Sequence, residues 1–270
     1  MIRCRGLVHV YPNGTRAVDG VDLAIEAGER VAIVGQNGSG KSTLVRHWNG
    51  LLRPTAGEVE IDGRAAAGQR VAALARTVGI AFQDPDRQIF AGRVRTEVEF
   101  GPRNVGLRGA ALTTAIDAAL DATGLTDAAA ANPYDLGFSR RKLLALASIL
   151  AMGTPVVVLD EPTTGQDARG TKRVEAVVAD LAAQGRTVVA ISHDMRFVAE
   201  NFARVVVMAA GHVILDGPPE EVFAEPSWPS LASTYLEAPL SARLGARLGL
   251  GSTPTDASLI DALGGATAGG

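Results

Sequence analysis

Cysteine is almost missing from this chain, because Cys4 is the only one among 270 residues. A single thiol cannot close an intramolecular disulfide, and it cannot supply the several thiolates of a structural zinc cluster. Both of these covalent and metal-based supports are therefore excluded. The low cysteine content also agrees with a reducing compartment.

Aromatic and charged residues are scarce as well, at 4% and 20%, whereas 47% of the residues are hydrophobic. This composition excludes disorder as the dominant state, and the length suffices for one large domain or two small ones. The 26 Lys and Arg are outnumbered by 29 Asp and Glu, which gives a net charge of −3. No overall positive field exists to hold nucleic acid or acidic lipid, although a local positive patch is possible, and we expect no nucleic-acid partner.

Long hydrophobic runs are missing too. The longest one, residues 143–152, has about half of the ~20 residues needed to cross a membrane. The N-terminus lacks the continuous apolar stretch of a secretory signal. We therefore expect a protein of the cytosol, and any membrane role should be peripheral, at the cytoplasmic face.

Segments typical of strands and helices alternate along most of the chain. We expect strands at residues 6–11, 17–25, 31–34, 57–61, 77–82, 156–159, 187–191, 205–209 and 213–215. Helices are expected at residues 41–50, 167–183 and 195–202, and throughout 94–150 with interruptions at Pro102, Gly124 and Pro133. This alternation predicts an α/β fold with a mostly parallel sheet, to which the early strands and the helical middle are attached.

A glycine-rich segment follows the buried strand at residues 31–34 and precedes a helix. Its residues Gly35, Gln36, Asn37, Gly38, Ser39, Gly40, Lys41 and Ser42 match the phosphate-loop pattern. Glycines let backbone N–H groups surround a phosphate, and the helix N-terminus adds partial positive charge. Lys41 would bridge the outer phosphates, Ser42 would offer a hydroxyl to Mg²⁺, and Thr43 would donate to an inner phosphate. The alternative is a glycine-rich turn that contains Lys-Ser by chance.

Two adjacent carboxylates end the apolar strand at residues 156–159. Neighbouring side chains at a strand end point in different directions, so each acid can have its own task. Asp160 would hold Mg²⁺ through its water shell, and Glu161 would orient and deprotonate the attacking water. The alternative is a solvated strand end, which the nearby phosphate loop disfavours.

His193 follows the next strand, where a neutral imidazole could hydrogen-bond the terminal phosphate and the attacking water. The other histidines, His9, His47 and His212, have no such context, and we interpret them as packing or surface residues.

Several of these features occur in one order along the chain, namely Tyr11, the phosphate loop, Gln83, Asp160-Glu161 and His193. In this order they resemble the ATP-binding subunits of ABC transporters, from about residue 2 to residue 225. The resemblance implies a P-loop NTPase core with a mostly parallel sheet, an N-terminal antiparallel β subdomain and a helical subdomain. It also implies that Tyr11 stacks on adenine, that Gln83 senses Mg²⁺ and the γ-phosphate, and that Gln166-Asp167 touches a partner ATPase.

Residues 82–88 (FQDPDRQ) and 98–104 (VEFGPRN) resemble more narrowly the energy-coupling-factor branch, whose ATPases drive uptake of vitamins or of cobalt and nickel ions. That likeness implies a pair of ATPases beneath an integral membrane coupling protein and a separate substrate-binding membrane component. The residues after Gln83 would then form part of a groove for a coupling helix.

One motif departs from the family pattern. Where ABC ATPases carry Leu-Ser-Gly-Gly-Gln before a helix, here residues 142–152, this chain has Leu136-Gly137-Phe138-Ser139-Arg140. Ser139 could still cap the helix, but Phe138 hinders close approach of a nucleotide bound to the partner. Because each ABC site combines the phosphate loop of one subunit with the signature of the other, we expect a heterodimer with unequal sites, although a homodimer is possible.

These patterns divide the chain into an ATPase domain at residues 1–226, with its helical subdomain at about 84–152, and a partly flexible C-terminal extension at 227–270. The function predicted is an ATP- and Mg²⁺-dependent ATPase that powers an energy-coupling-factor importer. Alternatives are the ATPase of another ABC transporter class and a soluble ABC ATPase without a transport role. A P-loop GTPase or small-molecule kinase is disfavoured, because no Asn-Lys-x-Asp motif for guanine occurs.

Overall fold

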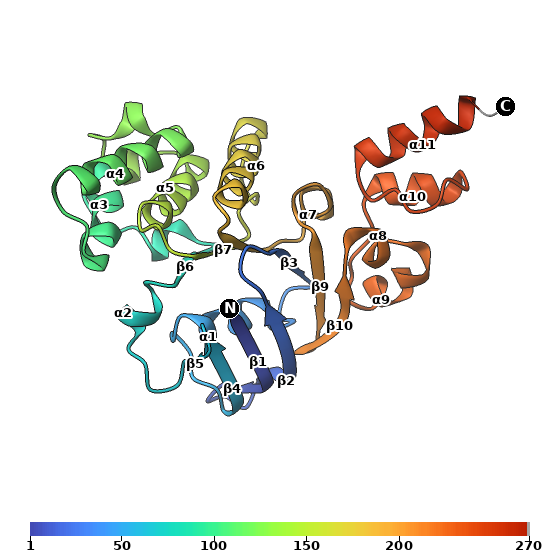
Figure 1. Cartoon of the computed structure of the whole chain (residues 1–270), viewed down its shortest axis with the longest axis horizontal. Helices are drawn as coiled ribbons and strands as arrows, with labels where there is room; N and C mark the ends of the chain where they lie inside the picture. Colours follow the sequence, from blue (N-terminus) through green and yellow to red (C-terminus); the bar gives the residue numbers. More distant parts are fainter. Residues whose placement is uncertain (269–270) are drawn as a thin grey trace.

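Two β-sheets form the centre of the computed structural model, which describes residues 1–268 (Figure 1). The first sheet is antiparallel and has the strand order β2-β1-β4-β5. Its strands are β1 (Ile2–Val10), β2 (Arg16–Ile25), β4 (Ala56–Ile61) and β5 (Arg64–Ala65). This sheet is the antiparallel attachment that the sequence predicts.

The second sheet has the order β10-β9-β3-β8-β7-β6, and all its pairs are parallel except the hairpin of β9 and β10. Its strands are β3 (Arg30–Val34), β6 (Val78–Ala81), β7 (Val156–Asp160), β8 (Thr187–Ile191), β9 (Arg204–Ala209) and β10 (His212–Gly217). Successive residues of β3 belong to different cores, Val31 and Ile33 to one and Ala32 and Val34 to the other. Both faces are therefore covered, which explains why these strands read as unbroken apolar runs.

Helices surround this sheet on several sides (Figure 1). They are α1 (Lys41–Trp48), α2 (Val71–Leu74), α3 (Val94–Val105), α4 (Gly109–Thr123), α5 (Phe138–Leu150), α6 (Ala168–Ala183) and α7 (Met195–Asn201). Short 3-10 turns lie at Pro85–Arg87, Thr126–Ala128, Pro133–Asp135 and Glu225–Ser227. The helices α3, α4 and α5 contact one another and form the helical attachment beside β6 and β7.

Pro102 does not interrupt the helical middle, contrary to the sequence expectation, because α3 continues through it to Val105. A proline removes one N–H donor and its ring crowds the carbonyl four residues earlier. Here it lies in the last turn, so little of the helix depends on the lost bond. The expected break at Gly124 is correct, since this residue ends α4 with φ +67.

The chain after β10 folds into four further helices, α8 (Pro219–Val222), α9 (Trp228–Ser233), α10 (Leu240–Arg247) and α11 (Asp256–Ala268). They lie on the side of the parallel sheet opposite α3 to α5, next to β9, β10 and α7 (Figure 1). The helix α11 extends to Ala268, and residues 269–270 lie outside the described part of the chain. The partial flexibility expected for residues 227–270 stays a prediction.

The carboxyl ends of β3, β7 and β8 meet at one edge of the parallel sheet. Gly35 follows β3, Glu161 follows β7, and Ser192-His193 follows β8. Parallel strands bring residues distant in sequence to one edge, which is the usual place for a ligand site in an α/β sheet. The fold thus gathers the predicted chemistry at this edge.

Candidate nucleotide site

The phosphate loop runs from Gly35 to the start of α1, and its backbone needs glycine. Gly40 has φ +103, and a Cβ there would lie 2.2 Å from the carbonyl oxygen of Ala17. The loop carbonyl of Ser39 accepts from the N–H of Gly211, at 3.1 Å. Close packing against two neighbouring segments therefore determines the loop's path, and any side chain at position 40 would disturb it.

Lys41 begins α1 and is only 6% exposed. Its ammonium group donates to the carbonyl oxygens of Gly35, at 2.6 Å, and Gln36, at 2.9 Å. Burial lowers the pKa of Lys41, while the nearby carboxylates of Glu161 and Asp160 raise it. A buried cation at the mouth of a loop of N–H groups is suited to a polyanion.

Asp160 is the last residue of β7 and is 4% exposed. Burial raises its pKa, and a hydrogen bond from Ser42 acts in the opposite direction. Its Oδ1 atom is buried and has no hydrogen-bond partner in the described structure. An unpartnered buried carboxylate oxygen is costly unless a cation or a donor is bound there.

Glu161 has a left-handed backbone, with φ +52, which is unusual for a residue with a side chain. Its Oε2 atom accepts from the hydroxyl of Thr164, at 3.1 Å, and lies 2.7 Å from Nδ1 of His193. Since a carboxylate only accepts, the imidazole donates from Nδ1. Lys142 donates to the backbone carbonyls of Glu161 and Thr164. Backbone and carboxylate are therefore held by separate partners.

A cavity of about 430 Å³ joins these groups. It is lined by Tyr11, by the phosphate loop and the first turn of α1, by Gln83, and by Asp160 and Glu161. The hydroxyl of Tyr11 lies 3.0 Å from that of Thr43, so the tyrosine is held against the first turn of α1. The cavity thus presents an aromatic ring, a phosphate-binding loop and two carboxylates to one ligand.

Three of the residues predicted to bind ATP or to catalyse its hydrolysis lie outside the lining of this cavity. Gly35 and Ser39 are buried behind the loop surface, and His193 reaches the site through its contact with Glu161. Of the other histidines, His9 and His47 are buried and His212 is exposed, in agreement with packing and surface roles.

The signature-equivalent residues Gly137, Phe138 and Ser139 lie at the start of α5 and do not line the cavity. The helix begins at Phe138, earlier than residue 142. Ser139 does not cap it, contrary to expectation, because this residue lies within the first turn and its hydroxyl donates to Oε1 of Gln166, at 2.5 Å. The Phe138 ring would lie 2.7 Å from a Cβ added to Gly165. This region therefore packs against the loop that follows Glu161.

Sequence reasoning missed Thr164 and Lys142, the two residues that hold Glu161. Thr164 follows the acidic pair within a turn, a spacing at which a hydroxyl can return to the carboxylate. Lys142 is a lysine at the head of an apolar helix and is only 6% exposed. A buried lysine needs hydrogen-bond acceptors inside the protein. The presence of a lysine in an otherwise apolar helix could therefore have indicated a structural role for Lys142.

Within residues 1–268, no helix combines the length and the apolar character needed to cross a membrane. Fold and site together define a nucleotide-binding protein with a phosphate loop. Comparison with known proteins then narrows this class.

The family described as ABC transporter matches residues 18–164. The energy-coupling factor transporter ATP-binding protein EcfA of Methanothermobacter thermautotrophicus is 38% identical over 96% of this chain and 83% of the relative. The solved structure of CbiO1 from Clostridium perfringens, part of the ABC transporter complex CbiONQ, has a TM-score of 0.75 at 33% identity and covers 92% of this chain and 98% of that chain. A dimeric ATP-binding cassette in a post-hydrolysis state, bound to ADP and Pi, has a TM-score of 0.74 at 25% identity, with 81% and 98% covered.

The chain belongs to the ABC transporter family and, within it, to the ATP-hydrolysing subunits of energy-coupling-factor transporters. The predicted family, fold class and ATPase activity are thereby confirmed.

Proposed function

We propose that this ATPase subunit binds Mg²⁺-ATP in the 430 Å³ cavity and hydrolyses it only after a second ATPase subunit closes the site. The observation that carries the proposal is the cavity itself, which runs from the ring of Tyr11 past Lys41 to the carboxylate of Glu161. Adenine would stack on Tyr11, and the phosphates would lie along the loop N–H groups of Gly35, Asn37, Gly38, Ser39 and Gly40.

The residues around Asp160 fit a magnesium ion. Mg²⁺ prefers oxygen ligands and retains several waters. Ser42 and Gln83 offer a hydroxyl and an amide oxygen beside Asp160, whose Oδ1 has no partner in the described structure. No group of three or more His, Cys, Asp or Glu able to hold a metal occurs among residues 1–268. Waters and phosphate oxygens would complete the shell. Bound there, the ion would neutralise phosphate charge.

Glu161 is the proposed general base. Its carboxylate would take a proton from water as the water oxygen attacks the terminal phosphorus, and the bond to the leaving ADP oxygen would break. His193 donates to the same carboxylate and would orient it toward the water and the terminal phosphate. The hydroxyl of Thr164 donates to the same oxygen, Oε2.

The partner is proposed to be a different ATPase subunit, so that the dimer is a heterodimer. Ser139 is engaged with Gln166 and Phe138 lies over Gly165, so the signature region of this chain is occupied by its own loop. It would therefore seal a nucleotide on the partner poorly. The reverse site, made from this phosphate loop and an intact signature on the partner, would be the active one.

A membrane coupling protein is proposed to bind a second cavity, of about 320 Å³, beside the residues after Gln83. Its rim carries Phe90 and Phe100, which are 61% and 51% exposed and contact each other edge to face. Exposed aromatic pairs of this kind mark interaction surfaces. The subunit would then lie at the cytoplasmic face of the membrane, with a separate membrane protein selecting the substrate.

ATPase activity of the purified chain, alone and mixed with a second ATPase subunit, tests the proposal. We expect low activity alone and a large gain on mixing. Vigorous, cooperative hydrolysis by the lone chain would contradict the heterodimer. Purification in mild detergent tests the membrane link, because a soluble ABC ATPase would elute without integral membrane proteins.

A further inference from the structure

Thr234, the residue that follows α9, touches the phosphate loop from the far end of the chain. The N–H of Gln36 donates to its Oγ1 atom at 2.9 Å, across 198 positions of sequence. The same hydroxyl donates its own hydrogen to the carbonyl of Met208 in β9, at 3.2 Å. Thr234 is fully buried, at 0% exposure, so no water replaces it. One hydroxyl therefore joins the phosphate loop, the parallel sheet and the C-terminal helices.

The peptide unit between Gly35 and Gln36 is held at both of its polar ends. Its N–H donates to Thr234, and its C=O, the carbonyl of Gly35, accepts from Lys41 at 2.6 Å. Rotation of this peptide plane would break both bonds at once. Thr234 thus determines the orientation of a group that also positions the proposed phosphate-binding lysine.

Little space is left for the loop to adopt another path here. Gly35 has φ +146, and a Cβ on it would lie 2.2 Å from the carbonyl oxygen of Met208. That oxygen is the acceptor for Thr234. The absence of a side chain at Gly35 lets the loop lie directly on the end of β9. Thr234 then bonds to both the loop and this strand.

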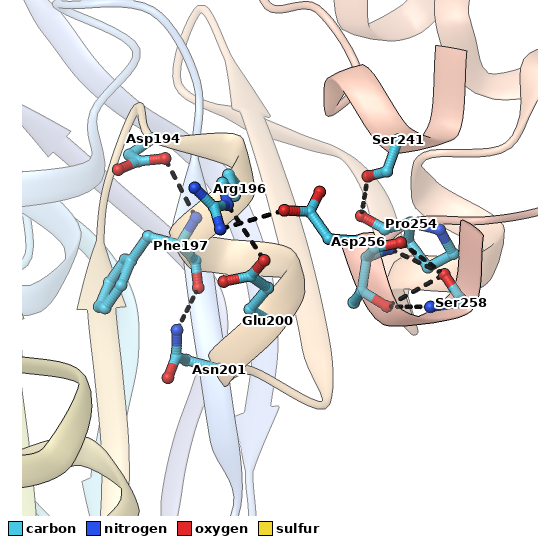
Figure 2. Close-up of polar contacts among 10 residues, drawn as sticks. Asp194, Arg196, Phe197, Glu200, Asn201, Ser241, Pro254, Asp256 and Ser258 are labelled. Carbon is cyan, nitrogen blue, oxygen red and sulfur yellow. Dashed lines mark hydrogen bonds and ion pairs between the residues drawn. The ribbon is translucent and has the colours of Figure 1, made fainter. Parts of the chain in front are cut away.

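A second contact joins the C-terminal helices to α7, as Figure 2 shows. Asp256, at the start of α11, pairs with Arg196 on α7 at 3.0 Å, and Arg196 also pairs with Glu200 at 3.1 Å. Their side chains are well exposed, Arg196 at 69% and Asp256 at 53%. Exposed ion pairs contribute little to stability, whereas the hydrogen bonds of a fully buried hydroxyl, here that of Thr234, are costly to lose. Of the two contacts, we therefore expect the one made by Thr234 to contribute more to holding the C-terminal helices against the phosphate loop.

We propose that Thr234 is a positioning residue for ATP binding, through which the C-terminal helices set the affinity of the phosphate loop. It touches no nucleotide; it acts through the peptide of Gly35 and Gln36. The inference rests on the proposed role of this loop in holding ATP. Loss of the hydroxyl removes the acceptor of the part-buried Gln36 N–H and the donor to the buried Met208 carbonyl, and the loop has to rearrange.

Replacement of the hydroxyl tests the proposal on the full chain. Thr234→Val keeps the shape and removes the hydrogen bonds, whereas Thr234→Ser keeps them. Thr253→Val is the matched control, because Thr253 is 1% exposed in the same group of helices and its hydroxyl donates to Ser241 instead of the loop. With a fluorescent ATP analogue and Mg²⁺, we expect roughly 5- to 10-fold weaker binding for Thr234→Val. The serine variant and the control should stay within about twofold of the wild type.

Each result decides a separate point. Wild-type affinity in Thr234→Val, or an equal loss in Thr253→Val, overturns the inference while the proposed function stands. Failure of the wild type itself to bind overturns the proposed function and the inference with it. Should the valine variant not fold, amide hydrogen exchange of the wild-type chain decides, because a Gln36 amide bonded to buried Thr234 exchanges slowly and fast exchange contradicts the contact.

Discussion

The phosphate loop and the signature-equivalent region carry the two halves that an ABC site requires, and they differ in where their polar groups point. The phosphate loop lines an open cavity with Asn37, Gly38 and Gly40. At the start of α5, Ser139 is bonded to Gln166 in the same chain, and Phe138 covers the loop beside it.

We therefore propose that this chain keeps one half of a composite site and lacks the other. The proposal rests on contacts as well as on sequence. Lys142, Phe138 and Ser139 all contact the segment after Glu161, so the region that would serve a partner instead supports this chain's own carboxylate. The two ATP sites of the proposed heterodimer are then expected to differ in activity.

Removing the charge of the phosphate loop should give the largest effect on the intact half. Lys41→Ala deletes a buried cation, so we expect ATP binding to weaken about 10³-fold, which corresponds to about 4 kcal/mol. Equilibrium binding of labelled ATP measures it. Lys172→Ala, on the exposed face of α6, is the control and should bind like the wild type. Unchanged binding in Lys41→Ala would remove this loop from the site.

Replacement of the proposed general base should affect ATP hydrolysis but not ATP binding. Glu161→Gln keeps the shape and one acceptor oxygen but cannot take a proton, so hydrolysis should fall by about 10²-fold or more while ATP binding persists. Steady-state phosphate release, assayed with the partner subunit, measures the first quantity, and filter binding measures the second. Normal turnover in this variant would assign the base elsewhere.

Lys142 lies in α5, one turn after Ser139, and binds the backbone of Glu161 and Thr164, so its titration should affect stability. Burial lowers the pKa of its ammonium to about 8 from 10.5. Between these values the unfolded chain binds more protons than the folded one, so this group adds stability as pH rises from about 8 to 10.5. The wild type should therefore gain up to about 3 kcal/mol relative to Lys142→Met over that window.

Urea unfolding of both proteins at several pH values measures this difference. The buried thiol of Cys4 also titrates near the window, with its pKa raised to about 11 by burial, but it is common to both proteins and cancels. Parallel pH profiles would mean that the Lys142 ammonium keeps its ordinary pKa.

Restoring the family signature at residues 137–140 should give the smallest effect, a modest gain in ATPase activity. Gly137→Ser, Phe138→Gly, Ser139→Gly and Arg140→Gln together restore the family signature, and we expect ATPase activity of the lone chain to rise roughly tenfold. Preorganised donors near phosphate charge are the physical reason. Cooperativity in the ATP titration of the repaired chain is the second readout. No gain would indicate that Phe138 is not what prevents self-pairing.

The sequence predicted the phosphate loop and the acidic pair because both are local patterns next to buried strands. The loop from Gly35 to Ser42, with Asp160 and Glu161, lines or borders one cavity. Tyr11 and Gln83 came only from the family resemblance, since neither has a local pattern, yet both line the same cavity. Their residue roles, and the division of the chain at residue 226, stay predictions.

Other features could not be predicted, because they depend on how distant segments pack. Thr234 meets Gln36 across 198 positions, and nothing near either residue indicates the other. Ser139 was considered a possible cap of α5, but the helix starts one residue before it and the hydroxyl donates to Gln166. Pro102 was expected to end a helix, a rule that weakens in the last turn.

The left-handed backbone of Glu161 has a consequence for engineering. A non-glycine residue at φ +52 destabilises the folded state by about 1 kcal/mol or more, and glycine would adopt this backbone conformation with less strain. Glu161→Gly would relieve this strain, but it would also remove the carboxylate that Thr164 and His193 bind. The strained position is therefore one where heat resistance and turnover can be selected in opposite directions, and thermal selection on this scaffold has to be paired with selection for ATP hydrolysis.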